Sequence, residues 1–559
     1  MLKVDGDSLT VETKTLRARF QGGALVSLVR ISDGREFLDR AEARSKPALE
    51  LVYPGRGAPA LSGAPGDRVG CWRLNALSAE YRFEGWYGDG VLGVSEDPKT
   101  GDLVVEPSGY ASRPGLQACR WNVAGIAPGL KLVAPFFQGV KLDLEDPLIA
   151  GSRWPWPHSW EAGLAILQGD AGGFWVHCRD DRYRFKALQV GPDSLGGQRR
   201  LGFETEAAGP LDRNLAAGGL AWRLNVYEGD WRIPAGLYRD WLRRAYAPRS
   251  PRPDWLEEVR FAVSWCPCDA GLPEALSSRI DPSKVLLHVP RWRTDPYDEN
   301  YPTFRASDEG RRFIEQARAA GFRVMPHMNS VDMDPTHPAC PYVRDFQYRD
   351  AVSKAVQGWT WVDGKVLPVP ESNAARLRHR DTKTMVKIHP GLAMWRSILA
   401  ENVAEAARDL GLDAVFLDVT LCTWNTDNAV VEYETTPEGM RRLIAIAAGL
   451  GDGLVVGGEG RNEVIAQELS FAQVHLFRSW QQSLEGLERT GGCPLNEFLF
   501  EGLCRSFGYS RLDGSTVDSA LRMRTHVSLG AIPTVTVRSA RELAEPNEGV
   551  AEMLDLACR

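Results

Sequence analysis

The chain changes its hydrophobic rhythm near residue 230, and this change constrains the fold more than any other feature. Before it, short runs such as LVVEP, GGFWVHCRD and GGLAWRLNVYEG alternate apolar and polar residues between Gly, Asp and Pro. After it, short apolar runs alternate with longer stretches of helical period. The first rhythm is typical of antiparallel strands joined by turns, and the second of βα units on a parallel sheet.

Eight apolar runs recur in the second half of the chain. Helix signals lie between them, because Ser307 precedes one amphipathic stretch and Gly411 follows another. Eight parallel strands with intervening helices close a barrel. The candidate strands are FAVSW (261–265), VLLHV (285–289), FRVMPH (322–327), DAVFLD (413–418), LVVGGE (454–459), FAQVHLF (471–477), FLFEGL (498–503) and IPTVTV (532–537).

These patterns predict a multidomain β plus α/β protein. An N-terminal antiparallel β-sandwich of the supersandwich type covers 1–232, and a linker helix with the Pro-rich stretch PRSPRPDW covers 233–255. A catalytic (β/α)₈ TIM barrel then spans 256–559. Residues 335–390, between the third and fourth strands, are too long for a plain loop, so we expect a lid or small subdomain there.

Composition narrows the classes of function. The net charge of −7, with Lys and Arg scattered among acidic residues, argues against a nucleic-acid partner. No stretch approaches the roughly 20 apolar residues of a membrane span. The N-terminus lacks the apolar core of a signal peptide, so we expect a cytoplasmic protein. The ten cysteines are widely spaced apart from Cys266 and Cys268, and we expect mostly buried free thiols.

Two carboxylates end neighbouring strands of the predicted barrel. Asp418 ends the fourth strand and Glu459 the fifth. The active sites of such barrels lie at the C-terminal ends of the strands. Adjacent strands lie about 4.8 Å apart, so we expect the two carboxyl groups to face each other across roughly 5–6 Å, the separation of retaining glycosidases. This predicts Asp418 as nucleophile and Glu459 as general acid/base. A helix cap, or an ion pair of Glu459 with Arg461, is the structural alternative.

Other strand ends carry polar and aromatic groups suited to a sugar pocket, because sugar rings stack on aromatic faces while their hydroxyls bond polar side chains. The predicted carbohydrate-binding residues are Trp265, Asp269, Trp292, Arg293, His327, Asn329, Trp424, Asn425 and Arg461.

A metal or cofactor is not expected. The cluster His327, Asn329, Asp332, Asp334 and His337 mixes nitrogen and oxygen ligands but lacks the spacing of zinc and calcium motifs. The glycines 451, 453 and 457 leave a helix and enter a strand, the reverse of a dinucleotide-binding fingerprint. No G-x-S-x-G and no phosphate-binding loop occurs.

The sequence also resembles known glycosidases. The opening ETKTLRARFQGGALVSLVRISDGREFL is similar to the N-terminal sandwich of several α-glycosidase families. The stretches HPGLAMWRSILAENVAEAARDLGLDAVFLDVT and VVGGEGRNE resemble an uncharacterised glycosidase-like family related to the retaining α-N-acetylgalactosaminidases. That resemblance implies an Asp nucleophile after strand four and a Glu acid/base after strand five, at Asp418 and Glu459.

Three functional hypotheses follow. The first is a retaining α-glycosidase, similar to α-N-acetylgalactosaminidases or α-galactosidases, acting on a small glycoside or oligosaccharide. The second is an α-glucosidase or α-galactosidase of the amylase-like clans, which a third carboxylate after strand seven, such as Glu501, would favour. The third is a carbohydrate-binding protein that keeps the barrel without turnover. The oligomeric state is not predicted.

Overall fold

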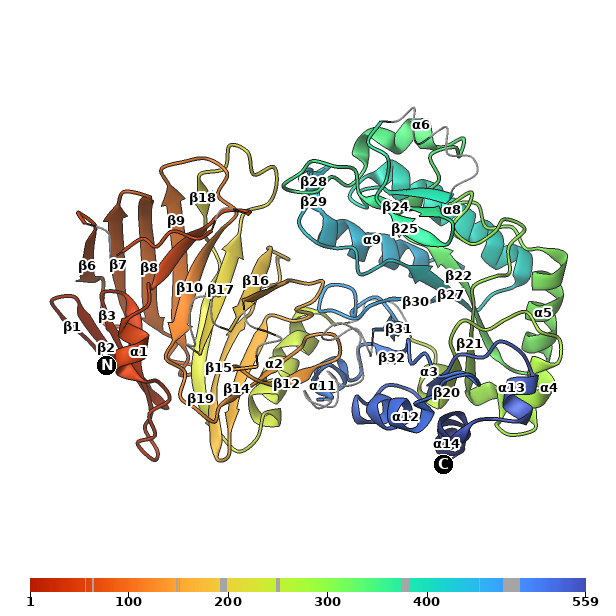
Figure 1. Ribbon diagram of the computed structural model, residues 1–559, viewed down its shortest axis with the longest axis horizontal. Helices are drawn as coiled ribbons and strands as arrows, with labels where there is room; N and C mark the ends of the chain where they lie inside the picture. The colour runs from red at the N-terminus through yellow and green to blue at the C-terminus, as the bar shows by residue number, and fades with distance from the viewer. Residues whose placement is uncertain are drawn as a thin grey trace. The chain divides into compact units, whose positions relative to one another are not determined.

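The computed structural model describes residues 1–559 except 56, 63–64, 147–148, 150, 192–198, 248–251, 373–375, 377–382, 452, 476–492 and 559. The chain forms two compact units. One comprises Met1–Ala245 with Glu488–Leu499, and the other Tyr246–Leu487 with Phe500–Arg559. The first is rich in strands, and the second alternates strands and helices (Figure 1).

The first unit is an antiparallel β-structure. One sheet has the order β1 (Leu2–Asp5), β2 (Ser8–Glu12), β3 (Leu16–Gln21), β4 (Ala24–Arg30). A second has the order β13 (Ser152–Pro155), β16 (Lys186–Val190), β17 (Arg200–Glu206), β10 (Ala118–Ala124), β5 (Leu49–Val52). The largest has the order β12 (Val140–Asp143), β11 (Lys131–Ala134), β14 (Leu164–Gly169), β15 (Gly172–Cys178), β19 (Trp222–Glu228), β9 (Leu103–Ala111), β8 (Gly88–Glu96), β7 (Ser78–Gly85), β6 (Arg68–Arg73), with β18 (Ala216–Ala217) beside β9.

The alternation in the sequence accounts for these strands. In β3 the side chains of Leu16, Ala18 and Phe20 are buried, whereas Arg17 and Arg19 are exposed. Successive side chains of a strand point to opposite faces, so one face enters the core. The helices of this unit are α1 (Arg40–Arg44), α2 (Arg232–Ala245) and most of α11 (Leu495–Phe500).

The second unit contains the predicted barrel. Its eight strands run parallel in the order β32 (Arg505–Gly508), β31 (Phe471–Val474), β30 (Val455–Glu459), β27 (Ala414–Asp418), β22 (Arg323–Asn329), β21 (Val285–Val289), β20 (Phe261–Val263), β33 (Thr534–Val535). The amide of Ile532 donates to the carbonyl of Ser506 at 2.8 Å and links the two end strands, so the barrel nearly closes. The predicted fold class is confirmed.

Helices connect most of these strands. The Ser307 side chain caps α5 by accepting from the amide of Gly310 at 3.0 Å, and Gly411 ends α8 in the left-handed conformation with φ 60°. Both signals were read from the sequence. Outside the inserted segment, the described helices of this unit are α3 (Trp255–Glu258), α4 (Leu272–Ser277), η1 (Pro282–Lys284), α5 (Asp308–Ala319), α8 (Ala393–Leu410), α9 (Thr436–Ala448), α12 (Ser519–Ser528), α13 (Arg541–Ala544) and α14 (Glu548–Ala557).

The prediction of strand seven at 498–503 is wrong. Those residues form the end of α11 and the turn after it, and the strand is β32, which begins at Arg505. The apolar residues of FLFEGL fit one turn of a helix as well as a short strand, and a run of this length cannot distinguish the two. Glu501 therefore lies before strand seven, exposed, and not at its C-terminal end.

The inserted segment after β22 contains a small antiparallel sheet. Its strand order is β23 (Asp332–Met333), β26 (Lys383–Lys387), β24 (Gly358–Val362), β25 (Lys365–Leu367). The short helices α6 (Cys340–Val343) and η2 (Arg344–Phe346) belong to the same segment. The hairpin β28 (Val430–Val431) and β29 (Glu434–Thr435) precedes α9. A sheet of its own explains why this connection is so long.

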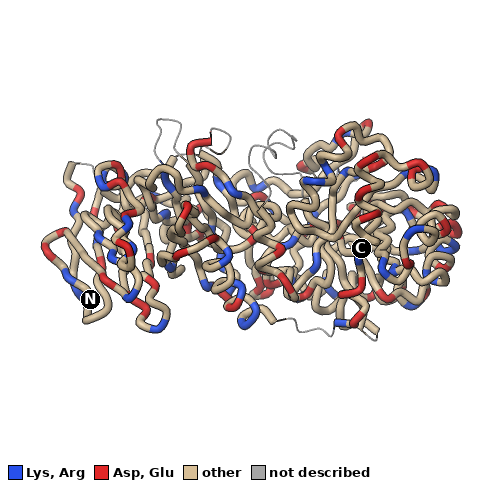
Figure 2. Tube along the Cα trace, turned by 90° about the horizontal axis from the view of Figure 1, so that it is seen from below, with Lys and Arg blue, Asp and Glu red and all other residues tan. Residues whose placement is uncertain are grey.

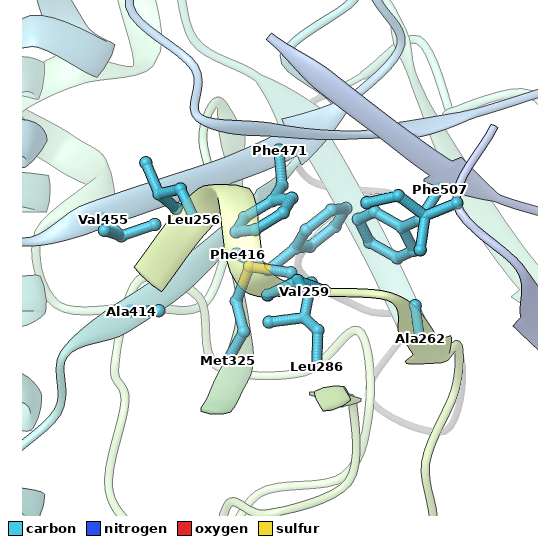
Figure 3. Packing of buried hydrophobic residues seen from close by; sticks show 11 residues of the cluster. Leu256, Val259, Ala262, Leu286, Met325, Ala414, Phe416, Val455, Phe471 and Phe507 are labelled. Carbon is cyan, nitrogen blue, oxygen red and sulfur yellow. The ribbon is translucent and has the colours of Figure 1, made fainter. Parts of the chain in front are cut away.

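The barrel interior is built in layers. Leu286, Met325, Phe416, Phe471 and Phe507 belong to one buried cluster (Figure 3). Interior side chains recur every second residue along a barrel strand. Asp418 lies two residues beyond Phe416 on β27. The alternation of side chains along the strand therefore brings its carboxylate to the same interior face, at the C-terminal end of the strand.

Other global properties agree with the composition. Lys and Arg are interspersed with Asp and Glu along the chain (Figure 2). Among the described residues, no helix is long and apolar enough to cross a membrane. All ten cysteines are free thiols and seven of them are buried, as expected.

Candidate active site

Asp418 ends β27 at the C-terminal end of the barrel. Its side chain is almost buried, and its Oδ2 accepts a hydrogen bond from Tyr297 Oη at 3.3 Å. His327 Nε2 lies 3.6 Å from the same oxygen. The main-chain carbonyl of Asp418 accepts from the amide and hydroxyl of Ser330 at 3.1 and 2.6 Å, which fixes the end of the strand.

Glu459 ends the neighbouring strand β30. Leu417 of β27 pairs with Gly458 of β30, so Asp418 and Glu459 occupy matching positions on adjacent parallel strands. Glu459 Oε1 lies 2.9 Å from His475 Nε2 and 3.5 Å from Tyr509 Oη. The predicted separation of roughly 5–6 Å between the two carboxyl groups stays a prediction.

A buried ion pair adjoins these acids. Lys387 Nζ lies 3.0 Å from Asp332 Oδ1, and Asn329 Nδ2 donates to Asp332 Oδ2 at 2.7 Å. Lys387 also lies over the ring of Trp359, 4.2 Å from its centroid. Because Lys387 comes from β26, the inserted sheet contributes directly to this charged cluster.

A fourth carboxylate, Asp298, is held by the same inserted sheet. Its Oδ2 accepts from the indole N–H groups of Trp359 and Trp361 at 3.1 and 2.8 Å. Asp298 is buried, and it lies next to Tyr297, the residue that donates to Asp418. Burial raises the pKa of Asp298 to about 6, although the two indole donors oppose this rise.

The electrostatics of the cluster are dominated by burial and like charge. Burial, followed by the nearby carboxylates of Glu459, Asp298 and Asp332, raises the pKa of Asp418 well above its usual range. Burial also raises the pKa of Asp332, although Lys387 opposes the shift. Among these described groups, four carboxyl groups lie near two cationic side chains, Lys387 and Arg293, so acidic groups are in excess at the site.

Three of the predicted binding residues lie near Asp418. His327 faces its carboxylate directly, and Asn329 bonds Asp332. The ring of Trp265 lies 5.4 Å from that of Tyr297 and 6.0 Å from that of His327. Trp265 itself is half-buried.

Trp424 and Asn425 lie in the loop that follows β27. Trp424 Nε1 donates to Gln357 Oε1 at 2.8 Å, next to the start of β24, and both residues are half-buried. This contact ties the loop after the candidate nucleophile to the inserted segment. Their predicted role in binding stays a prediction.

Four other predicted binding residues make contacts that account for them structurally. Trp292 is fully buried and donates to the carbonyl of His327 at 2.8 Å. Arg293 is buried and donates to the carbonyls of Pro296, Glu299 and Thr303. Asp269 accepts from the amide of Ala540, and fully buried Arg461 donates to the carbonyl of Cys504. A polar residue after a strand can brace a loop equally well, and the sequence does not distinguish the two uses.

The sequence reasoning missed Tyr297, Asp298, Lys387, His475 and Tyr509. Two of them carry a usable signal, because His475 and Tyr509 continue the alternation of Phe471 and Phe507 by steps of two residues. The other three lie in a loop or the inserted sheet, and only the tertiary fold brings them to Asp418.

The residues considered as a metal cluster are used separately. Asp334 Oδ2 accepts from the amide of Asn300 at 2.9 Å, and His337 Nε2 lies 3.0 Å from Thr303 Oγ1. In the part of the chain that the structure describes, no group of three or more His, Cys, Asp and Glu residues is arranged to hold a metal ion.

Comparisons with known proteins place this geometry in context. Residues 220–429 match a family model described as a domain of unknown function (DUF6259). A search of curated proteins found no match. Among solved structures, ligand-free α-N-acetylgalactosaminidase NagBb from Bifidobacterium bifidum is similar over 100% of this chain and 93% of its own, with a TM-score of 0.65 and 12% identity.

Two further solved structures are similar. A GH31 family sulfoquinovosidase from E. rectale matches 100% of this chain and 81% of its own, with a TM-score of 0.56 and 10% identity. The GH36 α-galactosidase AgaB from Geobacillus stearothermophilus matches 100% and 86%, with a TM-score of 0.50 and 9% identity. The chain shares its fold with these glycoside hydrolases. At such identities the likeness concerns the fold, so the chemistry must be argued from the site.

Proposed function

We propose that the protein is a retaining α-glycosidase with Asp418 as nucleophile and Glu459 as general acid/base. The observation that carries this proposal is the pairing of two carboxylates at matching C-terminal ends of the adjacent barrel strands β27 and β30. The fold shared with α-N-acetylgalactosaminidase NagBb supports it. The substrate is a small glycoside or oligosaccharide, with α-N-acetylgalactosaminides and α-galactosides as the first candidates.

The reaction takes place in two displacements. Asp418 attacks the anomeric carbon, the glycosidic C–O bond breaks, and Glu459 gives its proton to the departing oxygen. In the second step Glu459 takes a proton from water, whose oxygen displaces the Asp418 carboxylate from the anomeric carbon. Two inversions at one carbon give net retention, and the acid/base residue returns to its initial protonation state.

The charge of the site indicates the class of glycone. Among the described groups around the nucleophile, the carboxyl groups of Asp298, Asp332, Asp418 and Glu459 outnumber two cationic side chains, Lys387 and Arg293. A negatively charged sugar would be repelled by these carboxylates, because charges interact strongly in a buried site of low dielectric constant. We therefore propose a neutral glycone, in preference to a sulfonated sugar or a uronic acid.

The decisive experiment is a panel of aryl glycosides. We expect hydrolysis of a neutral α-glycoside with retained configuration of the first-formed sugar, as read by NMR, and much lower activity on sulfoquinovosides and uronides. Asp418→Asn should abolish turnover of every substrate in the panel. Asp413→Asn is the matched control, because this exposed residue lies just before the same strand. Full activity of Asp418→Asn, or inversion, would refute the proposal.

The inserted sheet provides a separate test. Because β24 and β26 supply Trp359, Trp361 and Lys387 to the site, replacing the exposed β25 turn should leave the fold intact, whereas Trp361→Phe should impair catalysis through Asp298. We expect kcat/KM to fall about tenfold for Trp361→Phe, the effect of one lost hydrogen bond to a charged group. Unchanged kinetics with the true substrate would show that the insertion has no catalytic role.

A further inference from the structure

A chain of hydrogen-bonding groups runs through the middle layer of the barrel to Asp418. It begins at the amide N–H of Trp265, which donates to His288 Nδ1 at 3.3 Å. His288 Nε2 lies 3.0 Å from His327 Nδ1. His327 Nε2 in turn lies 3.6 Å from Asp418 Oδ2, slightly beyond hydrogen-bond distance. Such catalytic contacts often tighten when substrate binds.

The hydrogen bond from Trp265 to His288 determines the tautomers of both histidines. A main-chain amide is always a donor, so His288 Nδ1 must be the acceptor and cannot carry a proton. A neutral His288 therefore carries its proton on Nε2 and donates it to His327 Nδ1. His327 Nδ1 then accepts, and a neutral His327 must carry its own proton on Nε2, directed toward Asp418.

The surroundings keep both imidazoles neutral. Burial lowers the pKa of His288 to about 3. Burial, followed by repulsion from His288 and Arg293, lowers the pKa of His327 well below its usual value. The ring of Phe416 lies 4.4 Å from that of His288 and 5.3 Å from that of His327. Around neutral pH both imidazoles are therefore uncharged, and the tautomer of each ring is the property that its hydrogen bonds determine.

Two further features support a fixed arrangement. Trp265 has a φ of 58°, a left-handed conformation that is uncommon for a residue with a side chain and typical of functional sites. Gln473 Nε2 lies 3.5 Å from His288 Nδ1 and donates to Ser264 Oγ at 2.6 Å. The main-chain amide of Trp265 and the side-chain amide of Gln473 thus both direct N–H groups toward His288 Nδ1.

We propose that His288 is a positioning residue that fixes the tautomer of His327, so that a neutral N–H group faces Asp418 Oδ2. This inference rests on the proposed function insofar as Asp418 is the nucleophile. Tyr297 donates to the same oxygen. Asp418 Oδ1 is buried and has no hydrogen-bond partner among the described residues. Tyr297 holds Oδ2 by a hydrogen bond, and His327 Nε2 lies 3.6 Å from the same oxygen, so both groups fix the orientation of the carboxylate.

The chain supplies a dipole in place of a cation. A hydrogen bond to the charged form of a carboxylate favours that form, which counteracts the burial of Asp418. A cation at this distance would also attract the nucleophile away from the sugar, whereas a neutral imidazole fixes its direction and exerts a weaker pull. Glu459, Asp298 and Asp332 act on Asp418 in the opposite sense, as like charges.

The tautomers can be measured without a substrate. Nitrogen NMR of the full chain with labelled histidine distinguishes protonated from bare ring nitrogens, and the His288→Gln and His327→Gln variants assign the two signals. We expect both rings to be neutral at pH 7 with the proton on Nε2. A proton on Nδ1 of His327, or a cationic His327, would overturn the proposal.

Kinetics test the consequence. His288→Met removes the donor to His327, whereas His288→Gln keeps an N–H group at the reach of Nε2. We expect kcat/KM to fall about 2- to 10-fold in His288→Met and less than about twofold in His288→Gln, as for a lost and a retained hydrogen bond between neutral groups. The acidic limb of kcat/KM should move to higher pH in His288→Met, because Asp418 loses a group that favours its ionised form.

The acidic limb reflects several described groups around Asp418. They include Tyr297, Tyr301, Arg293, His327, Asp298, Asp332, Lys387 and Glu459. The comparison between the two variants therefore carries the interpretation. Equal losses in His288→Met and His288→Gln would refute the positioning role. If the tautomers are as stated but Asp418→Asn keeps full turnover, the proposed function is wrong and the tautomer assignment stands.

Discussion

Replacing Glu459 with alanine should separate the two carboxylates by role. Glu459 lies at the end of β30, with His475 Nε2 and Tyr509 Oη at 2.9 and 3.5 Å from its Oε1. In the proposed mechanism it protonates the departing oxygen as general acid and activates water as general base. Its loss should therefore matter most for leaving groups that need a proton, and it should always slow the second step.

The expected magnitude follows from this dependence. General acid catalysis contributes about 10²- to 10⁴-fold, so Glu459→Ala should lose this factor with an alkyl or sugar glycoside. A dinitrophenyl or fluoride leaving group departs as a stable anion and needs little protonation. With these substrates we expect a first step close to that of the wild type, followed by slow turnover, and hence a burst. Glu401→Ala, an exposed change on α8, is the control for substitution in the barrel unit.

Product analysis with azide tests the assignment directly. Truncation of Glu459 leaves space beside the glycosyl-enzyme, and azide needs no general base to attack it. The product should be a glycosyl azide with the same anomeric configuration as the substrate, identified by NMR. An inverted azide from Glu459→Ala, or rescue of Asp418→Ala with retained configuration, would mean that the two roles are exchanged.

Other substitutions test the buried structure around the site. Lys387→Met should destabilise the barrel unit by about 3–5 kcal/mol because it leaves Asp332 buried and unpaired, and Asp332→Leu in the same chain should recover much of that loss in calorimetry. Gly457→Ala should lower the thermal midpoint, because the new Cβ would lie 2.5 Å from Met325 Sδ. The expected strain is about 1–3 kcal/mol, and Met325→Ala in the same chain should relieve it. The pKa of Asp298 is about 6 in the folded protein and near its ordinary value when unfolded, so the wild type should lose stability as pH rises from about 4 to 6 and Asp298→Asn should lose less. Parallel melting curves of the two proteins across that range would contradict the last expectation.

The barrel could be predicted because each of its strands and helices is indicated by residues that lie close together in the sequence. Each parallel strand is buried on both faces, so it reads as a short apolar run, and its helix begins and ends at capping residues such as Ser307 and Gly411. The strand FLFEGL shows the limit of this reasoning. Its residues Leu499 and Phe500 are buried in a short helix, and β32 follows as the less apolar stretch RSFG. Burial dictates apolar residues, but it does not dictate the backbone conformation.

The site was only partly readable from the sequence. Asp418 and Glu459 stand where an apolar strand ends, so position alone singles them out. Tyr297, Asp298 and Lys387 come from a loop and an inserted sheet, and no local pattern indicates that they converge on Asp418. Conversely, Trp292 and Arg293 follow a strand as binding residues would, but they are buried and bond main-chain carbonyls.

Alternation along the barrel strands predicts where a side chain lies, but not which contacts determine its protonation. Alternation along β27 puts Phe416 in the core and Asp418 two residues beyond it, and the same step on β22 leads from Met325 to His327. A histidine in the middle layer is therefore predictable in position but not in protonation, because its tautomer depends on the amide of Trp265, a contact made across strands. If the proposed tautomers are correct, the chemistry of this barrel depends also on the layer below the carboxylates, where specific hydrogen bonds fix the protons of His288 and His327.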